Sequence, residues 1–159
     1  MTEPGRFRDR RERKYGYDFV DEVLVVCPHC DGCAVVAPCP ERSSVRRRLR
    51  CAACGYAKDK TVNSVVVGGP VDPWFRRPVW LRATCRGHVL WAYNGRHLDL
   101  LKSYVAARLR ERGRMEPGAP QSLVERLPTW LKTAKNRDEI LRTIRRLRCA
   151  IPSSPPPPT

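Results

Sequence analysis

Two pairs of cysteines with C-x-x-C spacing constrain the fold of this chain more than any other feature of its sequence. Each C-x-x-C turn brings two thiolates to one point, and two such turns complete the tetrahedral set of four sulfur ligands that Zn²⁺ prefers. Residues 31–50 separate the two pairs, a length at the upper edge of what zinc ribbons use. We therefore predict one structural Zn²⁺ bound by Cys27, Cys30, Cys51 and Cys54.

The remaining cysteines and one histidine leave part of the ligand assignment open. Cys33 forms a further C-x-x-C with Cys30, and Cys39 lies close by, so either could exchange with a ligand. Cys85 and His88 have C-x-x-H spacing but no complete second ligand set nearby, and we expect His88 to form hydrogen bonds in a hairpin turn. Directly after the last ligand, Gly55 is placed where a tight metal-binding turn often needs a positive φ angle.

The net charge of the chain points to a polyanionic partner. Lys and Arg total 31 against 16 acidic residues, which gives a formal charge of +15. Nucleic acid is the leading partner class, ahead of an anionic membrane, although a high arginine content can also follow genomic base composition. We expect no signal peptide and no membrane-spanning segment, and cysteines with metal spacing favour the reducing cytoplasm over a disulfide scaffold.

The order of apolar and turn-forming segments predicts an α+β fold. A four-cysteine zinc ribbon of antiparallel strands is followed by a Trp-rich β-hairpin and C-terminal helices. The expected units are a disordered basic arm at 1–18, the zinc ribbon at 19–69, a β-hairpin plus helical domain at 70–149, and a disordered Pro-rich tail at 150–159. Within the ribbon the predicted strands are 23–26, 34–37, 45–50 and 61–67, and the hairpin strands are 79–84 and 89–93.

Apolar residues at helical spacing predict three helices after the hairpin. The first begins after Asn94 as N-cap, carries Leu98, Leu101, Val105 and Leu109, and ends near Gly113. The second has a capping box at Ser122 and Glu125, carries apolar residues from 123 to 131, and is broken or kinked at Pro128. The third begins at an Asn136–Glu139 capping pair and carries Ile140, Leu141, Ile144 and Leu147 on one face.

Two arginine clusters are candidates for contacts with nucleic-acid phosphates. The first lies on the ribbon hairpin, next to the metal site that would hold it rigidly, and contains Arg46, Arg47, Arg48 and Arg50. The second occupies the outer face of the last helix and contains Arg142, Arg145 and Arg146. Either cluster could instead be a solvated surface without a partner.

Aromatic residues beside arginines suggest base stacking, and Trp74 and Phe75 are the candidate exposed pair because they occupy a turn before Arg76. Trp80 and Trp91 lie in predicted strands and are expected in the core. The common phosphate-loop, zinc-protease and serine-hydrolase motifs are absent from the sequence. We therefore expect a protein that is not an enzyme and has no evident small-molecule substrate.

Several motifs together resemble a known family. They are CPHC at 27–30, CAACGY at 51–56, DPWF at 72–75, LWAYN at 90–94 and KNRDEIL at 135–141. Across about residues 20–148 the chain is similar to a bacterial, chiefly actinobacterial, family of small uncharacterised zinc-ribbon proteins. Some members carry a label borrowed from the ribbon of transcription factor IIB, and others one from the primosomal replication-restart helicase. The resemblance implies a four-thiolate zinc site at the cysteines named above, whereas a chain this short without a nucleotide-binding loop excludes helicase activity.

These observations lead to two functional hypotheses. The first is a small cytoplasmic zinc-ribbon protein that binds DNA or RNA through its arginine clusters. The alternative is an adaptor that docks on a larger transcription, replication or translation complex through Trp74, Phe75 and the Pro-rich tail, with zinc purely structural.

Overall fold

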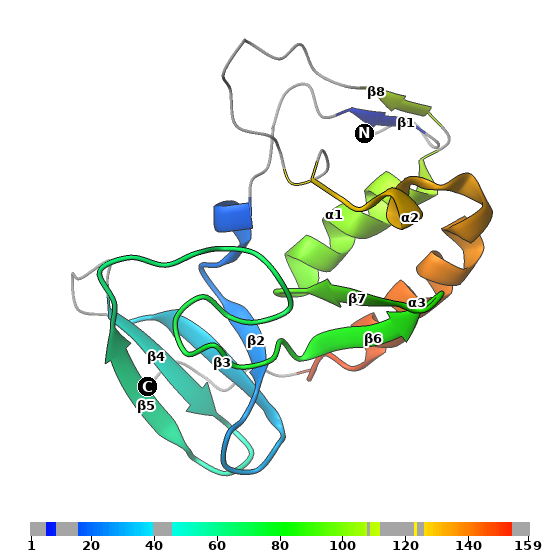
Figure 1. Cartoon of the computed structure of the whole chain (residues 1–159). Helices are drawn as coiled ribbons and strands as arrows, with labels where there is room; N and C mark the ends of the chain where they lie inside the picture. Colours follow the sequence, from blue (N-terminus) through cyan, green and yellow to red (C-terminus); the bar gives the residue numbers. More distant parts are fainter. Residues whose placement is uncertain are drawn as a thin grey trace.

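A computed structural model of the chain describes residues 6–8, 16–39, 46–107, 109–111, 123 and 126–153. It has an α+β fold, with an antiparallel four-stranded sheet followed by a β-hairpin and helices (Figure 1). Two short strands outside these units, β1 (Arg6–Arg8) and β8 (Leu109–Glu111), pair in parallel. Most of the predicted basic arm and of the Pro-rich tail lies outside the described residues.

The four-stranded sheet has the order β2-β3-β4-β5. Its strands are β2 (Val23–Val26), β3 (Cys33–Pro38), β4 (Arg46–Cys51) and β5 (Ala57–Thr61). The first three confirm the predicted segments within a residue or two at their ends. The prediction for the fourth, at 61–67, is wrong: the chain turns back directly after Cys54, so Ala57 pairs with Arg50 and Thr61 with Arg46. Residues 62–67 form no strand.

Side chains alternate across this sheet and divide it between two hydrophobic cores. On one face Val23, Val36 and Leu49 are buried together with Trp74. On the other face Leu24 joins the core formed by the hairpin and the helices. Strand β2 therefore connects the ribbon with the rest of the molecule.

The β-hairpin consists of β6 (Leu81–Cys85) and β7 (His88–Ala92). Its two-residue turn has positive φ at both positions, 53° at Arg86 and 76° at Gly87, which is the type I′ geometry that matches strand twist. Trp91 lies in β7, and Trp80 comes just before β6; both are half-buried.

Backbone hydrogen bonds join the ribbon to the hairpin. The N–H of Leu24 donates to the carbonyl of Tyr93 at 2.8 Å, and the N–H of Trp80 donates to the carbonyl of Leu24 at 2.9 Å. The N–H of Val26 donates to the carbonyl of Pro78 at 3.0 Å. The outer edge of β2 is thereby covered, and these bonds cross the predicted boundary at residue 69.

Helix α1 (Gly95–Ala106) begins as predicted, because the side chain of Asn94 accepts the N–H of His97 at 3.0 Å. The predicted end near Gly113 is wrong: the helix stops at Ala106, and Leu109 lies in β8. The guanidinium of Arg137 donates to the carbonyls of Val105, at 3.0 Å, and Ala107, at 3.5 Å. A distant residue thus satisfies carbonyls that a longer helix would otherwise bond.

The second predicted helix is reduced to the single turn α2 (Thr129–Lys132), which begins directly after Pro128. Ser122 and Glu125 lie outside the described residues. A short 3₁₀ turn (Ala134–Asn136) then leads into α3 (Arg137–Cys149).

Asn136 stands in front of α3 as predicted but does not cap it. Its backbone is already helical, and its side-chain amide donates to the carbonyl of Trp130 at 3.0 Å. The apolar face of α3 is confirmed, with Ile140, Ile144 and Leu147 buried against the hairpin and α1.

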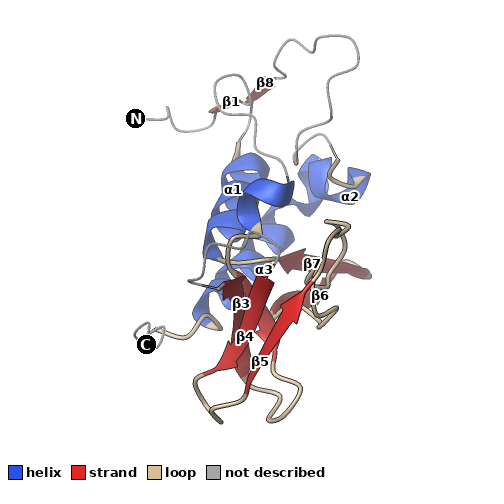
Figure 2. Cartoon of the chain, turned by 90° about the vertical axis from the view of Figure 1, so that its left-hand side faces the viewer, coloured by secondary structure: helices blue, strands red, loops and turns tan. Residues whose placement is uncertain are grey.

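The helices gather at one end of the molecule, and the turns β2–β3 and β4–β5 lie at the opposite end (Figures 1 and 2). None of the helices in the described residues has the length and apolar character needed to cross a bilayer.

Candidate metal centre

The first cysteine turn connects β2 with β3 and is closed by two backbone hydrogen bonds. The N–H of Cys27 donates to the carbonyl of Gly32 at 2.8 Å, and the N–H of Asp31 donates to the carbonyl of Cys27 at 3.1 Å. Asp31 has a φ of 60°, in the left-handed region that aspartate tolerates better than most residues. The chain is thereby folded back so that both thiols of the turn point the same way.

The second turn, between β4 and β5, repeats these bonds. The N–H of Cys51 donates to the carbonyl of Tyr56, and the N–H of Gly55 donates to the carbonyl of Cys51, both at 2.9 Å. Gly55 has a φ of 79°, which confirms the conformation predicted for it. It occupies the position that corresponds to Asp31 in the first turn.

The two turns bring the four predicted ligands together. All four Sγ atoms lie within 4.8 Å of one another. The Sγ of Cys27 is 3.7 Å from that of Cys54, and the Sγ of Cys30 is 3.5 Å from that of Cys51. Zn–S bonds of about 2.3 Å in a tetrahedron imply S···S edges of about 3.8 Å, so the spacing fits such an ion. These four cysteines can therefore hold one metal ion, as the sequence predicts.

The electrostatics of the cluster also favour a cation. Burial raises the pKa of Cys27, but the N–H groups of Cys30 and His29 and the neighbouring thiols lower it, to a net value of about 7. The N–H of Gly32 lowers the pKa of Cys30, but the thiol of Cys51 and its neighbours raise it to about 12. Once one thiolate has formed, its negative charge opposes the ionisation of the neighbouring thiols. A divalent cation bound between the sulfur atoms offsets this repulsion.

The surroundings of the cluster are tight on one side and open on the other. Cys27 and Cys51 are buried, whereas Cys30 and Cys54 are exposed. A Cβ at Gly32 would lie 3.2 Å from the Sγ of Cys30, closer than ordinary contact. Beside the exposed pair, the rings of His29 and Tyr56 stack with centroids 6.0 Å apart.

The other candidate ligands are not members of the four-thiol cluster. Cys33 is half-buried, and burial raises its pKa to about 11. Cys39 is buried, and Cys85 is 2% exposed in the hairpin core. The ring of His88 stacks on Trp130 with centroids 4.8 Å apart. Among the residues that the structure describes, no other group of three or more possible ligands comes together.

Two of the four predicted ribbon arginines are ion-paired within the sheet. Arg46 donates to Asp59 at 2.7 Å, and Arg48 donates to both carboxylate oxygens of Asp59 at 2.6 and 3.0 Å. Hydrogen bonds from Arg48 and Arg46 lower the pKa of Asp59 to about 2. Asp59 is within reach because it lies directly opposite Arg48 in the β4–β5 register. The prediction that the ribbon arginines contact nucleic acid stays a prediction. Arg50 is half-buried on the same face.

Arg47 points to the opposite face and covers Trp74. Its guanidinium carbon lies 4.0 Å from the Trp74 ring centroid, and burial lowers the pKa of the guanidinium. Trp74 is only 5% exposed, so the expectation of an exposed Trp74 for base stacking is wrong; Phe75 is half-buried.

Asp72 explains why the DPWF turn faces inward. Its carboxylate is fully buried and accepts the N–H groups of Trp74 at 3.0 Å, Phe75 at 2.6 Å and Arg77 at 2.6 Å. These bonds fix a turn that buries the tryptophan. The Asp-Pro pair in the sequence indicates such a turn, but not the side of the chain that becomes buried.

The three predicted arginines of α3 are all exposed on its outer face: Arg142, Arg145 and Arg146. Arg146 donates to the hydroxyl of Thr143 at 3.3 Å. In the part of the chain that the structure describes, no carboxylate pairs with any of the three. We call these residues the α3 arginine face.

Comparison with known proteins adds no further information: no family model, no curated protein and no solved structure matches the chain.

Proposed function

We propose that this chain is a small zinc-binding protein that binds nucleic acid, DNA or RNA, through the α3 arginine face. The observation that carries the proposal is a row of exposed arginines on one helix, none of which pairs with a carboxylate of the described residues, on a chain with a formal charge of +15. We infer further that it acts in a reducing cytoplasm as a binding protein and not as an enzyme.

The chemistry of the four thiols supports Zn²⁺ as the bound ion. A tetrahedral set of four sulfur ligands is typical of zinc or iron–sulfur sites, and two C-x-x-C turns are the usual zinc arrangement. Cys27, Cys30, Cys51 and Cys54 would hold one ion, which would fix the β2–β3 turn to the β4–β5 turn. Its role would be structural, because four protein ligands leave no position for a substrate.

Phosphate contacts fit the α3 arginine face better than the ribbon. Arg142 and Arg145 are three residues apart, and Arg142 and Arg146 are four apart, so all three share one side of the helix. On the ribbon, Arg46 and Arg48 would have to give up Asp59 before contacting a phosphate. The ribbon is therefore the secondary contact in this proposal.

Nucleic acid is favoured over a membrane surface because basic helices that bind membranes also insert apolar side chains. Among the described residues, the large apolar side chains that are exposed are Val66 and Val89, and neither belongs to α3. The adaptor alternative loses one of its motivating residues, since Trp74 is buried.

The test is fluorescence anisotropy of labelled single-stranded and duplex DNA and RNA with the zinc-loaded chain across a salt series. One variant replaces Arg142, Arg145 and Arg146 with Gln; a matched control replaces three exposed basic residues outside the ribbon and α3, Arg82, Lys102 and Lys135, with Gln. Three lost phosphate contacts should reduce the slope of log K against log salt by about 2.7 for duplex DNA or about 2 for single strands. Equal losses in both variants, or binding that does not depend on salt, would overturn the proposal.

A further inference from the structure

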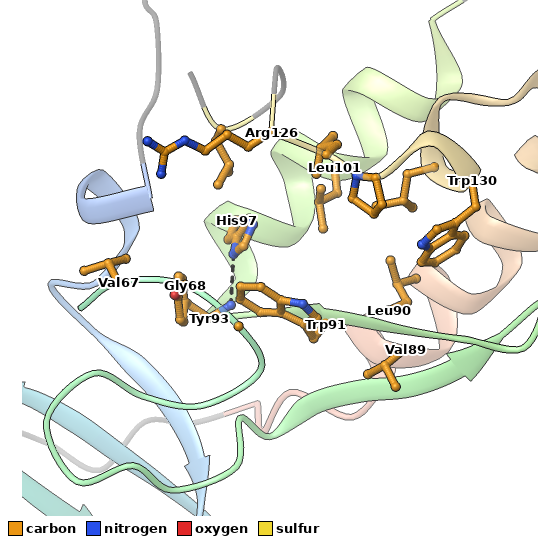
Figure 3. A pocket seen from close by; sticks show the side chains of 15 residues that line it. Val67, Gly68, Val89, Leu90, Trp91, Tyr93, His97, Leu101, Arg126 and Trp130 are labelled. Atoms are coloured by element: carbon orange, nitrogen blue, oxygen red, sulfur yellow. Dashed lines mark hydrogen bonds between the residues drawn. The ribbon is translucent and has the colours of Figure 1, made fainter. Parts of the chain in front are cut away.

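A cavity of about 220 Å³ lies between β7, the start of α1 and the α2 region (Figure 3). Aromatic and leucine side chains form most of its wall, among them Trp91, Leu101, Trp130 and Leu131. An apolar cavity of 150 Å³ is large enough for benzene, so this one accommodates one or two fused rings.

Two polar groups in this wall have hydrogen-bonding capacity to spare: the buried Oη of Tyr93, which has no partner among the described residues, and the ring of His97. His97 is 2% exposed, and its Nδ1 accepts the N–H of Tyr93 at 3.0 Å. Burial lowers the pKa of His97 to about 4, so the ring is neutral at pH 7 and carries its proton on Nε2. No residue in the described part of the chain accepts a hydrogen bond from this Nε2–H. A ligand oxygen would supply one.

The charge around the cavity selects the kind of ligand. Arg126 is exposed at the cavity and forms no ion pair with a described residue. Among the described residues that line the cavity there is no aspartate or glutamate. In the view of Figure 3, Arg126 and His97 lie toward one end and Trp130 toward the other. The site thus has a donor end and an aromatic end.

We propose that this cavity binds a small aromatic carboxylate of one or two rings. The carboxylate accepts hydrogen bonds from Arg126 and from the Nε2–H of His97, and the rings pack against Trp91, Trp130 and the leucines. This assignment is independent of nucleic-acid binding and of the α3 arginine face.

Three probes of the same shape and different charge test the assignment: 2-naphthoate, 2-naphthalenemethanol and 2-naphthylmethylammonium. Each is titrated into the zinc-loaded full chain by calorimetry and by ¹H–¹⁵N NMR of the tryptophan indole groups. The carboxylate should bind about tenfold more tightly than the alcohol, because its contact with arginine is a charge-assisted hydrogen bond. It should shift the indole signals of Trp91 and Trp130, which line the cavity, whereas Trp74, which does not line it, should stay unchanged.

Two exposed arginines provide the variant and its control. Arg126→Gln should weaken naphthoate about tenfold and leave the alcohol unaffected, and Arg82→Gln, which lies outside the cavity, should change neither. Absence of saturable naphthoate binding at millimolar concentration would overturn the proposal, as would equal binding of the ammonium probe. A response of Trp74 instead of Trp91 and Trp130 would also overturn it, as would an Arg126→Gln variant that binds naphthoate as the unmodified chain does.

Discussion

Asn94 joins the start of α1 to the segment before β2 and provides a quantitative test of the fold. Its side-chain oxygen accepts the N–H of His97 at 3.0 Å, and its amide donates to the carbonyls of Phe19 at 2.7 Å and Glu22 at 2.6 Å. The residue is 7% exposed, so water replaces these bonds poorly. Removing the side chain should therefore cost more than an ordinary helix cap.

The expected decrease in the free energy of unfolding for Asn94→Ala is the sum of two contributions. Loss of the cap costs about 1 kcal/mol. Leaving the buried carbonyl of Phe19 without a donor costs a further 1–3 kcal/mol, roughly, whereas Glu22 is exposed and its carbonyl can meet water. The free energy of unfolding should thus fall by about 2–4 kcal/mol. Asn94→Ser keeps a capping oxygen and should recover about 1 kcal/mol of that loss.

The assay is urea denaturation of the zinc-loaded variants, monitored by far-UV circular dichroism. The slope of the unfolding free energy against urea concentration is compared between variants. Asn94→Asp is the informative control, since it keeps the acceptor, loses both donors and places a charge against the carbonyls. It should be no more stable than Asn94→Ala. The reasoning would be refuted by an Asn94→Ser variant as stable as the unmodified chain, since the two donor bonds would then contribute nothing.

Three further predictions concern the charges and thiols of the molecule. Burial lowers the pKa of His97 to about 4, so at mildly acid pH the imidazole is protonated in the unfolded chain but not in the folded one. The free energy of unfolding should therefore fall by about 1 kcal/mol from pH 7 to 5.5. A His97→Gln variant with the same pH dependence in urea melts would contradict this. Asp59→Asn removes the carboxylate that Arg46 and Arg48 share, and it should tighten DNA binding and steepen its salt dependence. Asp21→Asn, which changes the same charge beside Arg96, should do so less, and equal effects would mean that net charge alone matters. Cys51→Ser should weaken Zn²⁺ binding strongly in a competition assay with a metal chelator, and Cys33→Ser should leave it near that of the unmodified chain; equal weakening would make Cys33 a ligand.

The features that the sequence predicts well are those set by local chemistry. The two C-x-x-C turns, the positive φ of Gly55 and the cap at Asn94 each depend on residues within a few positions of one another. The strands at 23–26 and 34–37 follow from short runs of apolar residues bounded by turns. In each case the local residue pattern is compatible with few other backbone conformations.

The features that it predicts poorly depend on distant partners. Asp59 pairs with Arg46 and Arg48 only because β5 pairs with β4 in that register, whereas the sequence-based prediction places this strand at residues 61–67. Carbonyls at the end of α1 accept hydrogen bonds from Arg137, which lies on another helix. The pocket at His97 could not be found from the sequence, because its walls come from separate segments and its histidine resembles an ordinary core residue.

The most direct test of the metal centre is X-ray absorption at the zinc edge on the purified chain, with the metal content of the same sample measured. The account predicts one zinc per chain, surrounded by four sulfur atoms at about 2.3 Å and by no nitrogen or oxygen ligand. A coordination shell with three sulfur atoms and a lighter ligand would contradict the closed structural site. A chain that folds without bound metal would contradict the role assigned to the four cysteines.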